Sequence, residues 1–410
     1  MYKHPLEVER SSTIRSISWL EERKSLATGG VYGDTYPVTW AADDNLYVGT
    51  GDPMYSMVDG RPRPSTWREA YRDPKLYGAM GGLAFEILTG SPQDFDIFRV
   101  NDMEGFTGPG GGGPKPTGVI SVDGTIYYAM QNMLGIKKTR FRPGSQHGSD
   151  ATIIKSTDYG KTWTPDLETL WKEFEAEHFD RNVLLSPNIK EWKTPDEARE
   201  EYKGWKPMFP GPLFGGPTFV QFGKDNMGAI DDYVYAVSAD QWDNGSELRA
   251  GRVKKDKIMD AGEWEFAKKK NGKFVWEKGL EDSDPVLAID GHISTPEVIY
   301  SRKLGKYILF NWSLHRDFYP SEGSSLSVFE ADSLFGDWKL VHYEWMWEKQ
   351  EACPYCPRVP LKWFDQENLT GYLLFSGSWW IKNPWYRPHV RKFKFIMADE
   401  VIKGTYVYRY

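Results

Sequence analysis

One pattern recurs five times along the 410 residues of this chain. In each copy a proline stands early in a short apolar strand, a polar turn follows, and a second strand returns with a tyrosine near its start. A proline at a strand start costs no hydrogen bond of the ladder, so each copy predicts one antiparallel hairpin. The prolines, which are 79, 101, 79 and 64 residues apart, are Pro37, Pro116, Pro217, Pro296 and Pro360.

Five successive hairpins predict an all-β fold, a five-bladed β-propeller in which each hairpin supplies the inner two strands of a blade. The spacings exceed the roughly 40–50 residues of common propeller repeats, so we expect long connections. The aromatic content of 15% and the 40 glycines suit many short strands and turns. We expect residues 1–410 to form a single propeller domain.

Two further stretches refine this architecture. Residues 156–163 read Ser-Thr-Asp-Tyr-Gly-Lys-Thr-Trp and match the Asp-box pattern S-x-D-x-G-x-x-W of sialidase-type propellers. Such a box lies on the periphery of a blade and indicates architecture, not catalysis. Residues 165–209 are rich in Glu, Lys and Trp, with apolar side chains at helical spacing. They predict a partly helical insertion between the second and third blades.

Charge and composition exclude several classes of protein. The net charge of −7 argues against a nucleic-acid partner, which usually requires a basic surface. No stretch approaches the roughly 18 apolar residues of a membrane helix, and residues 1–5 lack a signal core, so the compartment stays open. No dinucleotide fingerprint, HExxH motif or Ser-His-Asp order is present, and we expect no cofactor or metal.

The two cysteines, Cys353 and Cys356, are too few for a disulfide framework. A structural zinc usually needs four ligands, and no second cysteine pair exists. The two cysteines could bind zinc, form a local disulfide or redox pair, or be two ordinary thiols. We favour ordinary thiols.

Propeller geometry turns sequence position into location, because the first inner strand of each blade starts, and the second ends, at the same face. We therefore expect one group of polar and aromatic residues around the mouth of the central channel. The strand starts carry Asp34, Lys115, Gly216, His292 and Arg358. The strand ends carry Asp52, Asn132, Asp240, Trp312 or His315, and Trp379 or Trp380.

The carboxyl groups in this set suggest acid–base chemistry. Cleavage of a glycosidic bond requires two carboxyl groups that flank it, one protonated and one ionised. We assign Asp34 as base or nucleophile and Asp240 as acid, and Asp52 could adjust both by like-charge repulsion. Each of the three is also suited to capping a turn. Glu297 and Asp290 are the reserve candidates for the acid.

The remaining polar and aromatic residues of the set could bind a sugar. We expect Lys115, His292, Arg358, Trp379 and Asn132 to contact the substrate, with the two cations suited to an anionic sugar. His292 could also carry a proton, help to hold a metal, or be a structural histidine.

Residues 33–47, residues 115–127, the Asp box, and residues 216–235 together resemble a bacterial propeller family of unknown function, some relatives of which are endo-D-arabinanases. The resemblance covers roughly residues 30–310. It extends to the five-bladed glycosidases of the arabinanase and β-xylosidase type, in which an Asp on the first inner strand is the general base. It implies that role for Asp34. The Glu-Gly-Pro-like segment that supplies the acid in those enzymes is missing here.

The sequence thus predicts a glycoside hydrolase that acts on a polysaccharide or oligosaccharide partner. Two alternatives stay open. A polysaccharide lyase would use His or Tyr as base and a cation to neutralise a uronate, and His292, Lys115 and Arg358 fit that chemistry. A carbohydrate-binding propeller without catalytic activity is the other.

Overall fold

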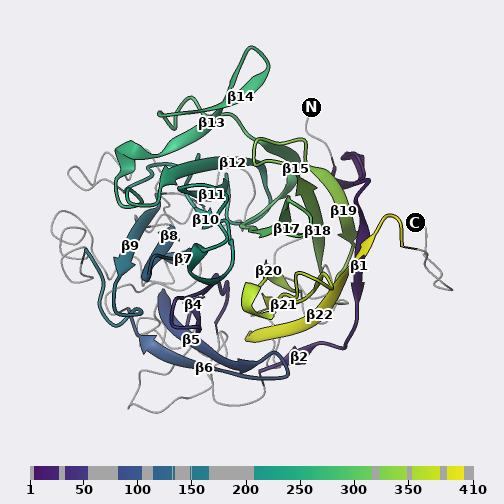
Figure 1. Ribbon diagram of the computed structural model, residues 1–410, viewed down its shortest axis with the longest axis horizontal. Coiled ribbons are helices and arrows are strands. Elements are labelled where there is room, and N and C mark those ends of the chain that lie inside the picture. The colour runs from purple at the N-terminus through teal and green to yellow at the C-terminus, as the bar shows by residue number, and fades with distance from the viewer. Residues whose placement is uncertain are drawn as a thin grey trace, which may run out of the picture.

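The computed structural model describes residues 4–26, 33–53, 82–103, 114–131, 133, 148, 150–165, 207–315, 323–348, 353–378 and 386–400. Its strands form five antiparallel sheets around a common axis, which is a five-bladed β-propeller (Figure 1). The predicted all-β, five-bladed propeller is confirmed. In the part of the chain that the structure describes, no helix is long and apolar enough to cross a membrane.

The first two blades follow the predicted hairpins. Blade 1 consists of β3 (Val38–Trp40), β4 (Leu46–Gly51), β5 (Leu83–Ser91) and β6 (Asp94–Asn101). Blade 2 consists of β7 (Lys115–Val122), β8 (Thr125–Gln131) and β9 (Thr152–Ser156). Every residue of β7 is buried, because neighbouring blades cover both faces of the inner strands. The inner strands therefore form near-continuous runs of buried residues instead of an alternating pattern.

Blade 3 is the largest sheet. It consists of β10 (Thr218–Phe219), β11 (Tyr233–Ala239), β12 (Gly245–Lys254), β13 (Glu265–Lys270) and β14 (Lys273–Glu277), and β15 (Leu287–Ile293) pairs with β12. Blade 4 consists of β16 (Glu297–Ser301), β17 (Lys306–Leu314), β18 (Ser324–Ala331) and β19 (Lys339–Glu344).

Blade 5 joins the two ends of the chain. Its inner strands are β20 (Tyr355–Arg358) and β21 (Thr370–Ser376), followed by β22 (Pro388–Met397). The outer edge of β22 is covered by β1 (Ile14–Trp19) and β2 (Lys24–Ser25) from the beginning of the chain (Figure 1). This pairing closes the ring and removes a long exposed strand edge.

The fifth hairpin differs from the prediction at its first strand. The proline pattern predicted a first strand that begins near Arg358 and contains Pro360, but β20 ends at Arg358 and Leu361–Trp363 is a short 3₁₀ helix, η5. The pairing of β20 with β21 also shifts register between Tyr355 and Arg358. The strand therefore starts at Tyr355 and places that side chain, instead of Arg358, at its beginning.

The expected helical insertion is not supported. The described residues contain no α-helix, only four 3₁₀ turns: η1 (Pro5–Glu7), η3 (Lys224–Asn226), η4 (Ala261–Glu263) and η5. Residues 166–206, which hold most of the predicted insertion, lie outside the described part of the chain. At its described end, Phe209 pairs with Ala151 in an antiparallel bridge.

The turn at residues 156–163 locks the outer side of blade 2 onto blade 1. Asp158 accepts hydrogen bonds from the backbone and side chain of Thr162 at 2.9 and 2.7 Å. Gly160 has a φ of +89°, and a Cβ at this position would overlap the ring of Phe85. Trp163 is buried edge-on against Phe85 of β5 and tilted against Tyr128 of β8, with ring centroids 4.9 and 5.6 Å apart.

Candidate active site

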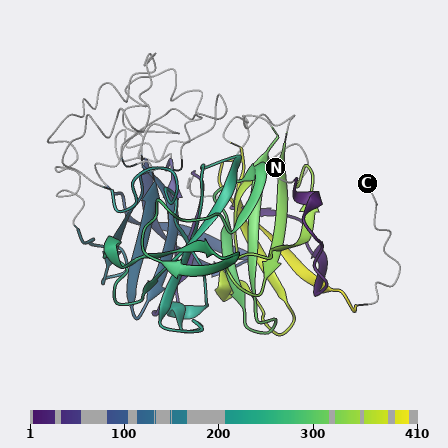
Figure 2. The ribbon, with the colours of Figure 1, turned by 90° about the horizontal axis from the view of Figure 1, so that it is seen from above.

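The hairpin register defines one end of the propeller, which we call the mouth end. Here the first inner strands begin and the second inner strands end, and the strands run from this end to the opposite one (Figure 2). Asp34 is paired with Gly51, Lys115 with Gln131, and Tyr355 with Ser376. Blades 1, 2 and 5 therefore bring Asp34, Lys115 and Tyr355 to the same level.

Asp34 is held by its backbone on a strained turn. It exchanges two backbone hydrogen bonds with Gly51, at 2.8 and 2.9 Å, and the next amide, of Thr35, donates to Ser376 Oγ at 2.9 Å. Thr35 and Tyr36 both have positive φ, 66° and 41°. Each such conformation costs about 1–3 kcal/mol in a residue other than glycine, and such strain concentrates at functional sites.

The Asp34 side chain is 7% exposed. Its Oδ2 accepts a hydrogen bond of 2.9 Å from the hydroxyl of Tyr355. Its Oδ1 is buried without a hydrogen-bond partner among the described residues. A buried polar atom without a partner is uncommon and is expected where a ligand or water completes the site.

A second carboxyl group lies beside Asp34. Asp52 Oδ1 is 2.9 Å from Lys115 Nζ in an ion pair that is almost completely buried. Tyr386 donates a hydrogen bond of 3.3 Å to Asp52 Oδ2, and Lys115 also donates to the carbonyl of Pro114 at 3.1 Å. Lys115 thus neutralises Asp52. The described contacts of its ammonium group are with protein atoms, the Asp52 carboxylate and the Pro114 carbonyl.

This environment raises the pKa of Asp34 to about 7. Burial is the main cause, and the negative charge of Asp52 adds to it. The hydrogen bond from Tyr355 and the charge of Lys115 lower the pKa and partly offset the increase. Asp34 therefore titrates near neutral pH.

A second layer lies deeper along the axis. Glu297 is paired with Phe310 in blade 4, and its carboxylate is 3.3 Å from Arg358 Nη1. Burial raises the pKa of Glu297 to about 8, against the opposing charge of Arg358. Arg358 is fully buried and donates to the carbonyls of Thr35 and Pro296 at 3.0 and 2.6 Å. These contacts join blades 5, 1 and 4 beneath Asp34.

Asp240 follows β11 at the mouth end of blade 3. Its Oδ1 accepts hydrogen bonds from the backbone amides of Ser246 and Glu247, at 2.9 and 3.1 Å. The side chain is partly exposed, and burial raises its pKa while these two hydrogen bonds oppose the increase. Asp240 closes the β11–β12 turn and has no described contact with Asp34 or Asp52.

His292 lies on β15 and belongs to a different group of side chains. Its Nδ1 is 3.0 Å from Ser313 Oγ of β17, and its ring meets that of His4 edge-on at 4.7 Å. The two other predicted substrate-binding residues, Asn132 and Trp379, lie outside the described residues. Among the residues that the structure describes, no group of three or more His, Cys, Asp or Glu could hold a metal ion.

Sequence reasoning missed three aromatic residues of the site, Tyr355, Trp242 and Tyr386, whereas it named Trp312 among the strand ends. Tyr355 packs against Trp242 and Trp312, with centroids 5.8 and 5.5 Å apart, and Trp312 Nε1 donates to the carbonyl of Thr295 at 3.0 Å. Tyr386, the third of them, donates the hydrogen bond to Asp52 described above. Tyr355 could have been found as a mouth residue if β20 had been expected to start there. The proline pattern instead placed that strand after Arg358.

Tyr355 lies between the two cysteines, which are free and completely buried. Both have positive φ, 37° for Cys353 and 51° for Cys356. Burial raises the pKa of Cys353 to about 12 and also raises that of Cys356. Both thiols are therefore protonated at neutral pH, which makes them poor nucleophiles.

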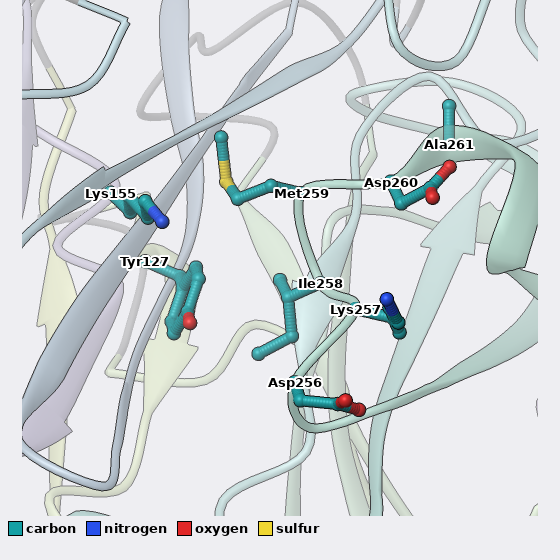
Figure 3. Close-up of a pocket in the computed structure, with 8 residues that line it drawn as sticks. All are labelled: Tyr127, Lys155, Asp256, Lys257, Ile258, Met259, Asp260 and Ala261. Carbon is teal, nitrogen blue, oxygen red and sulfur yellow. The ribbon is translucent and has the colours of Figure 1, made fainter.

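A separate pocket of about 420 Å³ lies between blades 2 and 3 (Figure 3). Tyr127 and Lys155 line one side, and the turn at residues 256–261 lines the other. Two lysines and two aspartates keep its charge balanced, and it shares no residue with the Asp34 site. Tyr127 is near the end of β8 opposite Gln131, so the pocket is away from the mouth end.

No family model and no curated protein matches the sequence. Among solved structures, the chain is similar to a protein of unknown function from Dyadobacter fermentans DSM 18053, with 10% identity, a TM-score of 0.46, and coverage of 93% of this chain and 100% of that one. It is also similar to an α-L-arabinofuranosidase from Podospora anserina in complex with cellotriose (10% identity, TM-score 0.42, coverage 93% and 98%). A GH43_1 enzyme from Xanthomonas citri gives 10% identity, a TM-score of 0.42, and coverage of 90% and 89%.

Proposed function

We propose that this protein is a glycoside hydrolase whose active site lies at the mouth end of the propeller. The proposal rests on the surroundings of the Asp34 carboxyl group. This group accepts a hydrogen bond from the Tyr355 hydroxyl and lies beside the buried Asp52–Lys115 ion pair. Two carboxyl groups in one buried site, with one of them neutralised by a lysine, give the other a pKa that suits proton transfer.

In this mechanism Asp34 is the base or the nucleophile. Its pKa of about 7 leaves a substantial ionised fraction at neutral pH. Oδ2 is oriented by Tyr355, and Oδ1 is the atom that would face a water molecule or the anomeric carbon. Asp52 raises the pKa of Asp34 by repulsion and is itself paired with Lys115.

The general acid is proposed to be Asp240. Its Oδ1 is occupied by two backbone amides, so Oδ2 is the oxygen that would carry the proton. Partial burial favours the protonated form, as an acid requires. Glu297 is less suitable, because it is buried beneath this level and paired with Arg358.

The described contacts favour hydrolysis over elimination. A uronate lyase needs a cation that faces the substrate carboxylate. Lys115 is paired with Asp52, and Arg358 is bonded to Glu297 and to two backbone carbonyls. Both cations thus bind groups of the protein itself, and neither suits the role of neutralising a substrate carboxylate.

A substrate screen tests the proposal. The protein would be incubated with arabinans, arabinoxylans, pectins and uronate-containing gums, and both new reducing ends and the ultraviolet absorbance of unsaturated uronates would be recorded. We expect reducing ends without that absorbance, and loss of activity in Asp34→Asn. Asp332→Asn is the matched control, because Asp332 is an exposed carboxylate that pairs with Lys306 at the opposite end of blade 4. Absorbance that rises with the reducing ends would overturn hydrolysis in favour of a lyase.

A further inference from the structure

Two aromatic side chains form a stacked pair at the mouth end of blade 4. His315 follows β17 and Trp345 follows β19, and both strands end at the mouth end because alternate strands of a blade run in the same direction. The two rings are almost parallel, 12° apart, with centroids at 3.4 Å. Trp345 is nevertheless 59% exposed. Since the imidazole covers one face of the indole, the exposed surface includes the other face.

The pair is held rigidly from beneath. His315 Nε2 is 2.6 Å from Ser325 Oγ, which in turn is 3.2 Å from the hydroxyl of Tyr343. The amide of His315 donates to the carbonyl of Gly323 at 3.1 Å. These bonds fix the imidazole on which the indole rests.

The turn that carries Trp345 is also fixed. Met346 has a φ of 58°, which reverses the chain directly after Trp345. Trp347 is completely buried, and its indole N–H donates to Ser324 Oγ at 3.0 Å. The turn and the imidazole thus hold the Trp345 ring in place, and a side chain that is already ordered loses less conformational entropy on binding.

A single exposed aromatic side chain is common on a protein surface and does not by itself indicate a binding site. Among the described residues the other strongly exposed aromatic side chain is Phe98 on β6, which has no ring partner there. Trp345 differs because it is backed by a second ring and lies at the end of the propeller that carries Asp34. A flat, electron-rich face of this kind stacks against the C–H groups of a sugar ring, and the imidazole and hydroxyl groups beside it suit sugar hydroxyls.

We propose that Trp345 and His315 form a sugar-binding platform that holds a pyranose or furanose ring of the polysaccharide away from the bond that is cleaved. The proposal rests on the proposed function, since it takes the polysaccharide substrate as its ligand. The platform would keep the polymer on the mouth end between successive cleavages.

Affinity electrophoresis tests this platform without turnover. Asp34→Asn, Asp34→Asn/Trp345→Ala and Asp34→Asn/Phe98→Ala would be run in native gels that contain soluble arabinan, arabinoxylan or pectin. We expect at least one polysaccharide to retard Asp34→Asn, and Trp345→Ala to weaken the apparent affinity about fivefold to tenfold, the size of one aromatic contact. Phe98→Ala should match the parent, and Trp345→Phe should recover part of the retardation. Equal melting temperatures would show that the variants are folded.

Equal retardation of the parent and Trp345→Ala, an equal loss in Phe98→Ala, or no retardation by any polysaccharide would overturn the platform. The outcome is separable from that of the proposed function. Retardation that depends on Trp345 in a protein that releases no reducing ends would retain the platform and refute the hydrolase. Hydrolysis together with retardation that is independent of Trp345 would retain the hydrolase and refute the platform.

Discussion

The hydroxyl of Tyr355 donates a 2.9 Å hydrogen bond to Asp34 Oδ2 and joins residues that are 321 positions apart in the sequence. Both side chains are buried, and Trp242 and Trp312 pack against the phenol ring. The hydrogen bond favours the ionised form of Asp34, whereas burial and Asp52 favour the protonated form. The ionisation of Asp34 thus depends on blade 5 as well as on blade 1.

Replacement of Tyr355 by Phe should move the pH dependence of activity toward higher pH. The change removes a hydrogen bond that lowers the pKa of Asp34, so the pKa should rise above about 7. Because the acidic limb of kcat/KM reports the pKa of the essential base in the free enzyme, that limb should shift to the alkaline side. An unchanged acidic limb with a reduced rate would mean that Tyr355 is only structural.

Asp52→Asn should move the same limb in the opposite direction. Loss of the Asp52 charge removes a repulsion that raises the pKa of Asp34, and Lys115 then acts on Asp34 alone, which also lowers it. The buried Lys115 would lose its partner, so we expect a loss of about 3–5 kcal/mol in unfolding free energy. The pH profile and a denaturant titration measure the two effects separately. A shift to higher pH would contradict the proposed role of Asp52.

Asp34→Asn should change how stability depends on pH. In the native protein the pKa of Asp34 is raised from 3.8 to about 7, so the folded state binds the proton more tightly than the unfolded state. The native protein therefore loses stability from this group as the pH rises from 3.8 to about 7, and the loss is constant above that range. Asn carries no charge, so the variant should gain stability relative to the native protein over the same interval. Denaturant titrations at pH values across this interval would measure it, and a constant difference would contradict the raised pKa.

Two glycines separate the cost of backbone conformation from the cost of a steric clash. Gly160 and Gly124 have φ values of +89° and +77°, but a Cβ at Gly160 would overlap the Phe85 ring, whereas a Cβ at Gly124 has nothing within 4 Å. Gly124→Ala should cost about 1–2 kcal/mol for its backbone alone. Gly160→Ala should cost about 1–3 kcal/mol more, because the contact of blades 1 and 2 must also shift. Equal losses in denaturant unfolding would show that the Phe85 ring adapts freely.

The sequence by itself determined the number of blades. Local chemistry carries this information, because prolines at or beside strand starts, polar turns and returning tyrosines each act within a few residues. Four of the five prolines stand at or directly before an inner strand, as predicted. Pro360 does not, since β20 ends at Arg358 after a register shift between Tyr355 and Arg358. The sequence also placed Asp34, Asp52 and Lys115 at one end of the molecule, since hairpin polarity alone fixes which end of a strand faces the mouth.

Only the tertiary structure decided which of these residues touch. The Asp52–Lys115 pair, the Tyr355 hydrogen bond and the burial of Arg358 depend on the closure of the ring and on the register between blades that are distant in sequence. The packing of β15 against β17 assigns His292 to a separate group. The pKa of Asp34 follows from burial, from the charges of Asp52 and Lys115 on blades 1 and 2, and from a tyrosine hydrogen bond of blade 5, and such many-body quantities are encoded in no single stretch of residues.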